Sequence, residues 1–197
     1  MFGFTLKRRI VRHRKPPERK AKILFEDGQS VVIKDRTFSI AAVDAQTNYS
    51  KAKIQGDTVI VTLPEGLDGR VRKKHISNLS RRAISKALLP AVEKRVTELN
   101  DLHFRSKINR VTLKDTSSMW ASCSVRNNIN LDFRLLLAPP HIMDAIIVHE
   151  LAHTVQRNHS KAFWSLVTNA MPDYKQRREW LRENAASLKP NIEAKHL

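Results

Sequence analysis

The 197-residue sequence predicts an α+β fold built as one main globular unit, and three observations support this prediction. Short segments rich in β-branched residues, separated by turn residues, occupy positions 22–66. Apolar residues recur with helical spacing between positions 84 and 99. The segment 141–156 is apolar on nearly all sides when projected as a helix, which is typical of a helix enclosed by the rest of a fold.

The composition is strongly basic. Lys and Arg total 36 against 19 Asp and Glu, so the formal charge is +17. Such a charge favours polyanionic neighbours, including nucleic acid, nucleotides or a membrane surface. The alternative is a solubility property without a dedicated ligand, because charge alone specifies neither fold nor chemistry.

Several features favour a cytoplasmic protein without a membrane partner. No stretch reaches the roughly 18 consecutive apolar residues that a membrane helix needs. The N-terminus lacks the order of a secretory signal, because its charges follow a very short apolar start. The single cysteine, Cys123, cannot form an internal disulfide and fits a reducing compartment. Nothing in the sequence specifies an oligomeric state.

Residues 1–21 form a predicted basic arm that precedes a domain at 22–190. We divide this domain into a β-rich region (22–66), a helical connector (67–103) and a core (104–190). The arm is either a solvated, mobile segment or an interaction tail. Its candidate polyanion-binding residues are Lys7, Arg8, Arg9, Arg12, Arg14 and Lys15.

Four strands are predicted in the β-rich region. Lys22–Phe25 and Val31–Ile33 flank Asp27-Gly28, which is a hairpin-like turn signal. Thr37–Val43 and Thr58–Leu63 are rich in β-branched residues.

The connector is predicted to be a long amphipathic helix, which Pro90 kinks or restarts. A basic cluster precedes its apolar stripe and either adds to a phosphate-attracting surface or is a plain exposed helix face. The cluster comprises Arg70, Arg72, Lys73, Lys74 and His75.

The core begins with two predicted strands, 108–113 and 128–133. In the second, apolar residues from Ile129 onward alternate with Asn128, Asn130 and Asp132, which indicates a half-buried strand. The segment 119–124 between them is predicted to be a turn or bulge anchored by Trp120.

The sequence His149-Glu150-Leu151-Ala152-His153 lies within the enclosed helix, and His159 follows six residues later. Histidines four apart lie on one helix face with Cβ atoms about 5–6 Å apart, so both can face one cation. Three protein nitrogens with a fourth position left to water are typical of catalytic zinc, and we expect one Zn²⁺ per chain. Glu150 would then take a proton from that water. A chance occurrence is disfavoured, because unpaired ionisable groups in a buried helix are costly.

The chain after this helix is expected to bring His159 back to the metal. Asn158 tolerates left-handed backbone, so we place the reversal there. Ser160 is a suitable N-cap for the next helix, which carries Phe163 and Trp164, and Pro172 separates that helix from the last one.

The core resembles the YgjP-like metallopeptidase family, a zincin-type group. The likeness is carried by the zinc motif together with Trp120–Ser124, Ile129–Leu131 with Arg134-Leu135, Asn158–Ser160 with Phe163-Trp164, Pro172–Tyr174 and Trp180-Leu181. Ala121 stands where the family usually has Gly, so the local turn is expected to differ, whereas Asn127 should substitute for a common Gly without strain.

The resemblance implies a zincin-like catalytic core in which a mixed sheet packs on the buried helix. It assigns His149, His153 and His159 as metal ligands and Glu150 as the catalytic acid/base. An edge strand beside a zincin site receives the peptide by strand addition. Our candidate is the 128–133 strand, with Asn128 and Asn130 as substrate contacts and an ordinary core strand as the alternative. Arg134 and Tyr174 are candidate oxyanion contacts, with packing or surface roles as the alternative.

The predicted function is therefore a zinc-dependent hydrolase, a metallopeptidase that uses zinc-bound water and a Glu base to cleave an amide bond of a peptide or protein. Two alternatives remain open. One is a metal-dependent nucleotide pyrophosphohydrolase. The other is a nucleic-acid-associated protein with a structural zinc, including a protease that acts on DNA-bound proteins.

Overall fold

The computed structural model describes residues 23–116, 119–188 and 191–193, and it confirms the α+β class. The helices are α1 (Gly69–His103), α2 (Pro140–Val155), α3 (Lys161–Ala170) and α4 (Tyr174–Asn184), with a 3-10 turn η1 (Phe133–Leu137). The strands are β1 (Ser30–Ile33), β2 (Arg36–Ala45), β3 (Lys51–Gln55), β4 (Thr58–Pro64), β5 (Arg110–Lys114), β6 (Ala121–Cys123), β7 (Asn128–Asp132) and β8 (Asn191–Glu193). No helix in the described ranges is long and apolar enough to cross a membrane.

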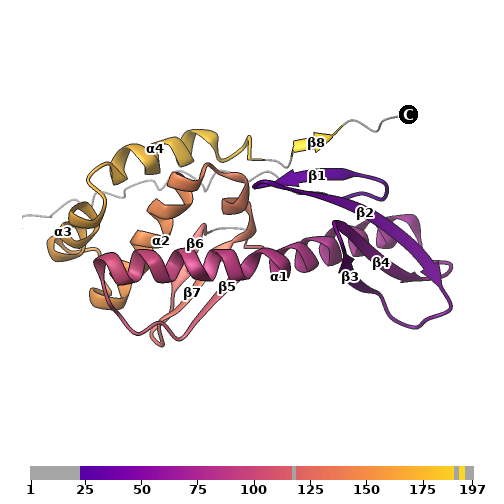
Figure 1. Ribbon diagram of the computed structural model, residues 1–197, viewed down its shortest axis with the longest axis horizontal. Coiled ribbons are helices and arrows are strands. Elements are labelled where there is room, and N and C mark those ends of the chain that lie inside the picture. Colours follow the sequence, from indigo (N-terminus) through magenta and orange to yellow (C-terminus); the bar gives the residue numbers. More distant parts are fainter. Residues whose placement is uncertain (1–22, 117–118, 189–190, 194–197) are drawn as a thin grey trace, which may run out of the picture.

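The helix α1 runs along most of the molecule and connects two sheets (Figure 1). A five-stranded sheet with the order β3-β4-β2-β1-β8 lies at one end. A three-stranded sheet with the order β5-β7-β6 lies at the other end, together with α2, α3 and α4 (Figure 1). Both sheets pack against α1, which therefore links the two halves of the fold.

The first predicted hairpin is wrong. Residues 23–26 form no strand, and β1 instead pairs with β2 through a tight turn in which Lys34 has a φ of 58°. Phe25 is buried, but its backbone N–H donates to Ser77 Oγ of α1 over 3.2 Å. A backbone N–H of this segment thus finds its hydrogen-bond partner on a helix and not on a neighbouring strand. Local sequence patterns do not reveal such a distant partner.

The strand β3 was missed by the sequence prediction. Half-buried Ala52 and Ile54 alternate with exposed neighbours, and Gly56 supplies a φ of 59° in the turn to β4. This alternation and the glycine turn were an available signal. The predicted strands at 37–43 and 58–63 are present as β2 and β4.

The helix α1 is continuous through Pro90, so the predicted restart at this residue is wrong. Asp68 caps the helix by accepting hydrogen bonds from the N–H groups of Arg70 and Val71. Leu88 and Val92 are buried on either side of Pro90, whereas Pro90 itself is exposed. Tertiary packing on both sides therefore offsets the one backbone hydrogen bond that proline cannot donate.

The three-stranded sheet is mixed, as expected, because β7 pairs parallel to β5 and antiparallel to β6. The predicted turn at 119–124 is wrong in part, because residues 121–123 form β6, with Ala121 opposite Leu131. The central strand is β7, so the candidate edge strand of the sequence prediction has both of its edges occupied. Its place at the edge is taken by β6.

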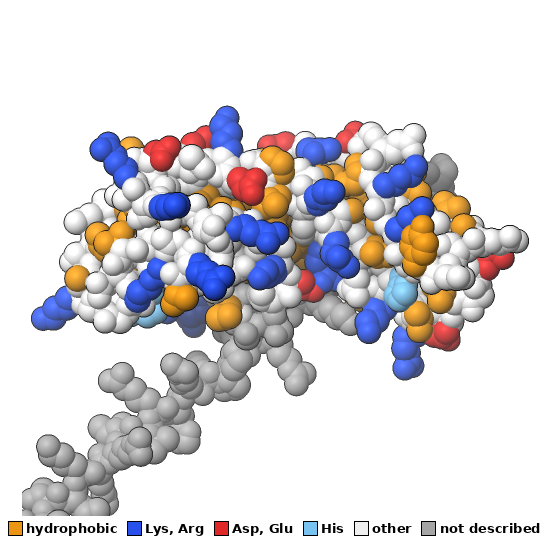
Figure 2. Space-filling view, turned by 90° about the horizontal axis from the view of Figure 1, so that it is seen from below, with side chains coloured by type: hydrophobic (Ala, Val, Ile, Leu, Met, Phe, Trp, Pro, Cys, Tyr) orange, Lys and Arg blue, Asp and Glu red, His pale blue; other side chains and the backbone are white. Residues whose placement is uncertain are grey.

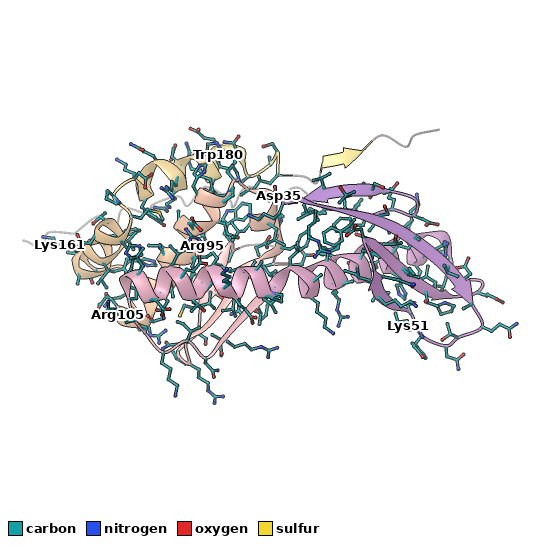
Figure 3. All side chains as sticks on the ribbon, viewed as in Figure 1. Asp35, Lys51, Arg95, Arg105, Lys161 and Trp180 are labelled. Atoms are coloured by element: carbon teal, nitrogen blue, oxygen red, sulfur yellow. The ribbon has the colours of Figure 1, made fainter. Side chains whose placement is uncertain are left out.

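The helix α2 is enclosed, as predicted. Ten of its residues are buried, and it contacts α1, α3, α4, η1 and the three-stranded sheet. Arg95 of α1 reaches toward α2, where its Nε and Nη2 donate to the two carboxylate oxygens of Asp144, each over 2.9 Å (Figure 3). This bidentate pair adds a fixed register to the apolar packing of the two helices.

A buried ion pair joins the end of β7 to η1. Asp132 is 0% and Arg134 5% exposed, and Arg134 Nε lies 2.7 Å from Asp132 Oδ1. The second oxygen of Asp132 accepts from the backbone N–H and the hydroxyl of Thr116, over 3.0 and 2.7 Å. The loop before β6 is therefore held against the core by polar contacts that are shielded from water.

Replacing Arg134 by Ala should lower the free energy of unfolding by about 3–5 kcal/mol, because the buried Asp132 carboxylate would be left without its partner. Urea denaturation followed by circular dichroism measures this change. The matched control is Arg182→Ala, in which an Arg with 57% side-chain exposure loses its ion pair with Glu179. The control should cost less than about 1 kcal/mol. Equal, small losses in both variants would contradict the structural role of Arg134.

Candidate metal centre

Three histidines converge beside the C-terminal half of α2. His149 and His153 lie one helical turn apart on α2, and His159 lies in the loop before α3. One ligand nitrogen from each of the three lies within 4.8 Å of the others. The Nε2 atoms of His149 and His159 are 3.2 Å apart. Nitrogens this close together can share a single cation.

Asn158 was expected to reverse the chain in a left-handed conformation, and this prediction is wrong. Hydrogen bonds of its side chain instead shape the loop that returns to α2. Among the described residues, positive φ outside glycine occurs at Lys34, Arg105 and Asn127. Gln156 leaves α2 in an extended conformation, and Asn158 Oδ1 accepts from Gln156 Nε2 over 2.7 Å and from Ser160 N–H over 3.3 Å.

Two predictions about neighbouring residues are confirmed. Ser160 accepts a hydrogen bond from the N–H of Phe163 over 3.4 Å and begins α3 directly after His159. Asn127 adopts a φ of 55°, which fits its place at a position where glycine is common.

Hydrogen bonds on the far side of two histidine rings fix which nitrogen faces the cluster. Tyr174 Oη lies 2.9 Å from His149 Nδ1, and the Gln156 carbonyl oxygen lies 3.2 Å from His153 Nδ1. An Nδ1–H that is donated outward leaves the lone pair of Nε2 toward the centre, which is the tautomer that binds a metal. Tyr174, a candidate oxyanion contact in the sequence analysis, thus lies behind the ring of His149.

Aromatic side chains pack against the rings of the three histidines. The ring centroid of buried Phe163 lies 4.5–4.9 Å from those of all three histidines. Trp164 stacks on His159 at 5.6 Å and 26°. These contacts restrict rotation of the imidazole rings, and they give the apolar stripe of α3 a role at the site that its periodicity alone did not indicate.

Burial controls the protonation of the site. It is the main cause that lowers the pKa of His149 to about 3, with smaller contributions from His153, His159 and Arg178. Burial also raises the pKa of Glu150 to about 7, and a hydrogen bond from the backbone of Cys123 opposes this shift. His149 is therefore a neutral nitrogen donor at physiological pH, and the donor set fits a divalent metal such as zinc.

Glu150 lies beside β6, which is an edge strand of the three-stranded sheet in the described part of the chain. The N–H of Ser124 donates to the Asn128 carbonyl and that of Asp132 to the Trp120 carbonyl. The hydrogen bonds to β7 are therefore made by the even-numbered residues in and beside β6. The backbone groups of Ala121 and Cys123 consequently point away from β7. The outward N–H of Cys123 donates a hydrogen bond to the Glu150 carboxylate, so the edge of β6 lies directly beside this carboxylate.

The remaining candidate residues from the sequence are not in this cluster. Asn128 and Asn130 lie on the sheet face opposite buried Ile129 and Leu131, where Asn130 binds Thr112 and Ser122 over 2.8 and 3.2 Å. Arg134 pairs with Asp132, as described above. The arm residues Lys7, Arg8, Arg9, Arg12, Arg14 and Lys15 lie outside the described part of the chain.

The Cys123 thiol is half-buried and also lies outside the cluster. Its Sγ accepts from the guanidinium of Arg157 over 3.6 Å, and Arg157 also donates to the Ser124 carbonyl over 2.8 Å. Arg157 thereby ties the loop after α2 to the end of β6. Because Arg157 lies between His153 and His159 in the chain, this contact fixes the loop that carries His159 next to β6.

Replacing Tyr174 by Phe should weaken zinc affinity by about 10–100-fold, because His149 Nδ1 would lose the partner that orients the ring. Competition with a chromogenic chelator measures this affinity without any substrate. Tyr49→Phe is the matched control, since Tyr49 is 61% exposed and lies on the loop before β3. Unchanged affinity in Tyr174→Phe would show that this contact does not orient the ligand.

A comparison with protein families agrees with the chemistry of this site. A family model described as YgjP-like, metallopeptidase domain, matches residues 5–184. A solved structure, the metallopeptidase zymogen abylysin of Pyrococcus abyssi, is 24% identical over 47% of this chain and 93% of its own, with a TM-score of 0.45. No curated protein matches the sequence. Because the family model covers most of the chain, the protein belongs to the YgjP-like family of metallopeptidase domains.

Proposed function

We propose that this protein is a zinc-dependent metallopeptidase in which His149, His153 and His159 hold one zinc ion and Glu150 is the general base. The observation that carries the proposal is the convergence of three imidazole nitrogens within 4.8 Å, beside a buried glutamate at a strand edge. Imidazole donors suit zinc, and three of them leave a coordination position for water.

A bound zinc ion would supply Lewis acidity that activates water and polarises the scissile carbonyl. Glu150 performs the proton transfers. Its carboxylate accepts a proton from the attacking water and delivers it to the leaving nitrogen. Burial suits both steps, because it raises the pKa of Glu150 to about 7, near the operating pH, so the group can both accept and release a proton. The Cys123 N–H holds the carboxylate at the edge of β6 throughout.

The peptide substrate pairs with β6 in this proposal. Ala121 presents an N–H and a carbonyl at the outer edge of the sheet, and Cys123 presents a carbonyl beside Glu150. An extended peptide can add to such an edge through main-chain hydrogen bonds, which would place one of its amide bonds next to the carboxylate. This assignment replaces the central strand β7 that the sequence prediction favoured.

The central test compares two variants of the site. Glu150→Gln should retain one zinc per chain but lose about 10²–10⁴-fold in peptide hydrolysis, because the amide cannot accept the proton. His159→Ala should lose both metal and activity. Elemental analysis of the purified protein and cleavage of a mixed peptide library measure the two effects. Glu179→Gln, at an exposed position of α4, is the control.

The outcomes separate this proposal from the two alternatives. Zinc-dependent release of pyrophosphate or phosphate from nucleotides, lost in Glu150→Gln, would favour the pyrophosphohydrolase instead. Stoichiometric zinc without any hydrolysis that depends on Glu150 would favour a structural metal.

Pairing with β6 can be tested on the substrate. N-methylation of one backbone amide at a time in a cleaved peptide should reduce kcat/KM by about fivefold at the position that donates to Ala121, since one hydrogen bond contributes roughly 1 kcal/mol. Positions whose amides point away from β6 should tolerate the change, so the sensitive positions should alternate. Uniform tolerance along the peptide would exclude strand addition.

A further inference from the structure

We infer that α1 and the outer face of the three-stranded sheet form a nucleic-acid-binding surface that recognises the phosphate backbone. This basic surface comprises Lys74, Arg82 and Lys86 of α1 with Arg110 and Lys114 of β5. It shares no residue with the metal centre or with the candidate residues of the N-terminal arm, and it does not depend on the proposed peptidase function.

The α1 part of the basic surface is a row of positively charged side chains. Seven Lys or Arg and no Asp or Glu lie between Asp68 and Glu93. Lys74, Asn78, Arg82 and Lys86 follow at intervals of four residues, and all four are exposed. This spacing places them along one face over about three helical turns, or roughly 18 Å. Lys74, Arg82 and Lys86 form no ion pair with any residue that the structure describes.

The β5 part continues the surface across the sheet. Arg110, Thr112 and Lys114 alternate onto the outer face, and both basic residues are exposed. Arg81 of α1 forms an ion pair with Asp115, which directly follows β5, so the end of the strand lies against the middle of α1. Figure 2 views the molecule from below, where Figure 1 shows α1 and this sheet, and Lys and Arg outnumber Asp and Glu across this face.

Two carboxylates at the ends of β5 and β7 are already paired with arginines. Asp132 follows Asn128 and Asn130 on the outer face of β7, but it is fully buried and paired with Arg134. Asp115 is paired with Arg81, and its second oxygen lies 3.9 Å from Arg134 Nη2. The cationic side chains thus face solvent without local compensation and attract anions.

Polar groups between the charges favour nucleic acid over a membrane as the partner. Thr112 donates to Asn130 over 2.8 Å and Asn130 donates to Ser122 over 3.2 Å, so hydrogen-bonding groups form a row across the sheet. Such side chains commonly contact phosphate and sugar oxygens next to Lys and Arg. A membrane-inserting amphipathic surface would instead present an apolar face next to its basic residues.

The test measures binding of the full-length protein to fluorescein-labelled poly(dT) of 30 nucleotides by fluorescence anisotropy over a series of salt concentrations. In Arg82→Ala/Lys86→Ala/Lys114→Ala, affinity should fall by about tenfold or more, and the slope of log K against log salt should become shallower by about 2. Thermal unfolding of each variant verifies that the exposed substitutions leave the fold intact.

The matched control is Lys161→Ala/Lys175→Ala/Arg178→Ala, which removes the same charges from exposed positions on α3 and α4. Lys161 lies at the far end of the molecule from the five-stranded sheet, and α4 lies on the side opposite β5 (Figures 1 and 3). The control should stay within about twofold of the unaltered protein, with its salt slope preserved. Equal losses in the two triple variants, or a loss in neither, would overturn the inference. Equally tight, equally Arg82-dependent binding to phosphatidylserine vesicles would also overturn it.

Discussion

The enclosure of α2 is the constraint on which the rest of the structure depends. Because α2 is apolar on nearly all sides, it contacts α1, α3, α4, η1 and the three-stranded sheet at once. A close-packed helix of this kind cannot rotate without exposing apolar surface or creating voids. The directions of His149 and His153 are therefore fixed by the core before any metal binds.

The surroundings of α2 complete the site with contacts from separate parts of the chain. Tyr174 of α4 holds His149, the Cys123 N–H of β6 holds Glu150, and Asn158 closes the loop that returns His159. Each contact satisfies a polar group that burial would otherwise penalise. The same contacts orient those groups toward one point, so stability and preorganisation have a common physical origin.

The helix α1 separates two kinds of surface. Its apolar face packs on both sheets and on α2, and its bidentate Arg95–Asp144 pair sets the position of α2. Its opposite face carries the exposed row of positively charged side chains. Chemistry at the end of α2 and electrostatic attachment along α1 would therefore be independent functions of one scaffold, since they share no side chain.

The sequence by itself determined the features that depend on local spacing. Histidines four apart define a candidate metal-binding face of a helix, apolar residues all round predict an enclosed α2, and Ser160 predicts the start of α3. All three follow from helical geometry within a few residues. Only the tertiary structure decided the features that depend on distant partners. Alternation identifies β7 as a strand, but its central place depends on pairing with β5 and β6, so the open edge moved to β6. Tyr174 and Arg134 likewise acquired their roles from His149 and from the buried Asp132 network, because a side chain's function is set by what packs against it.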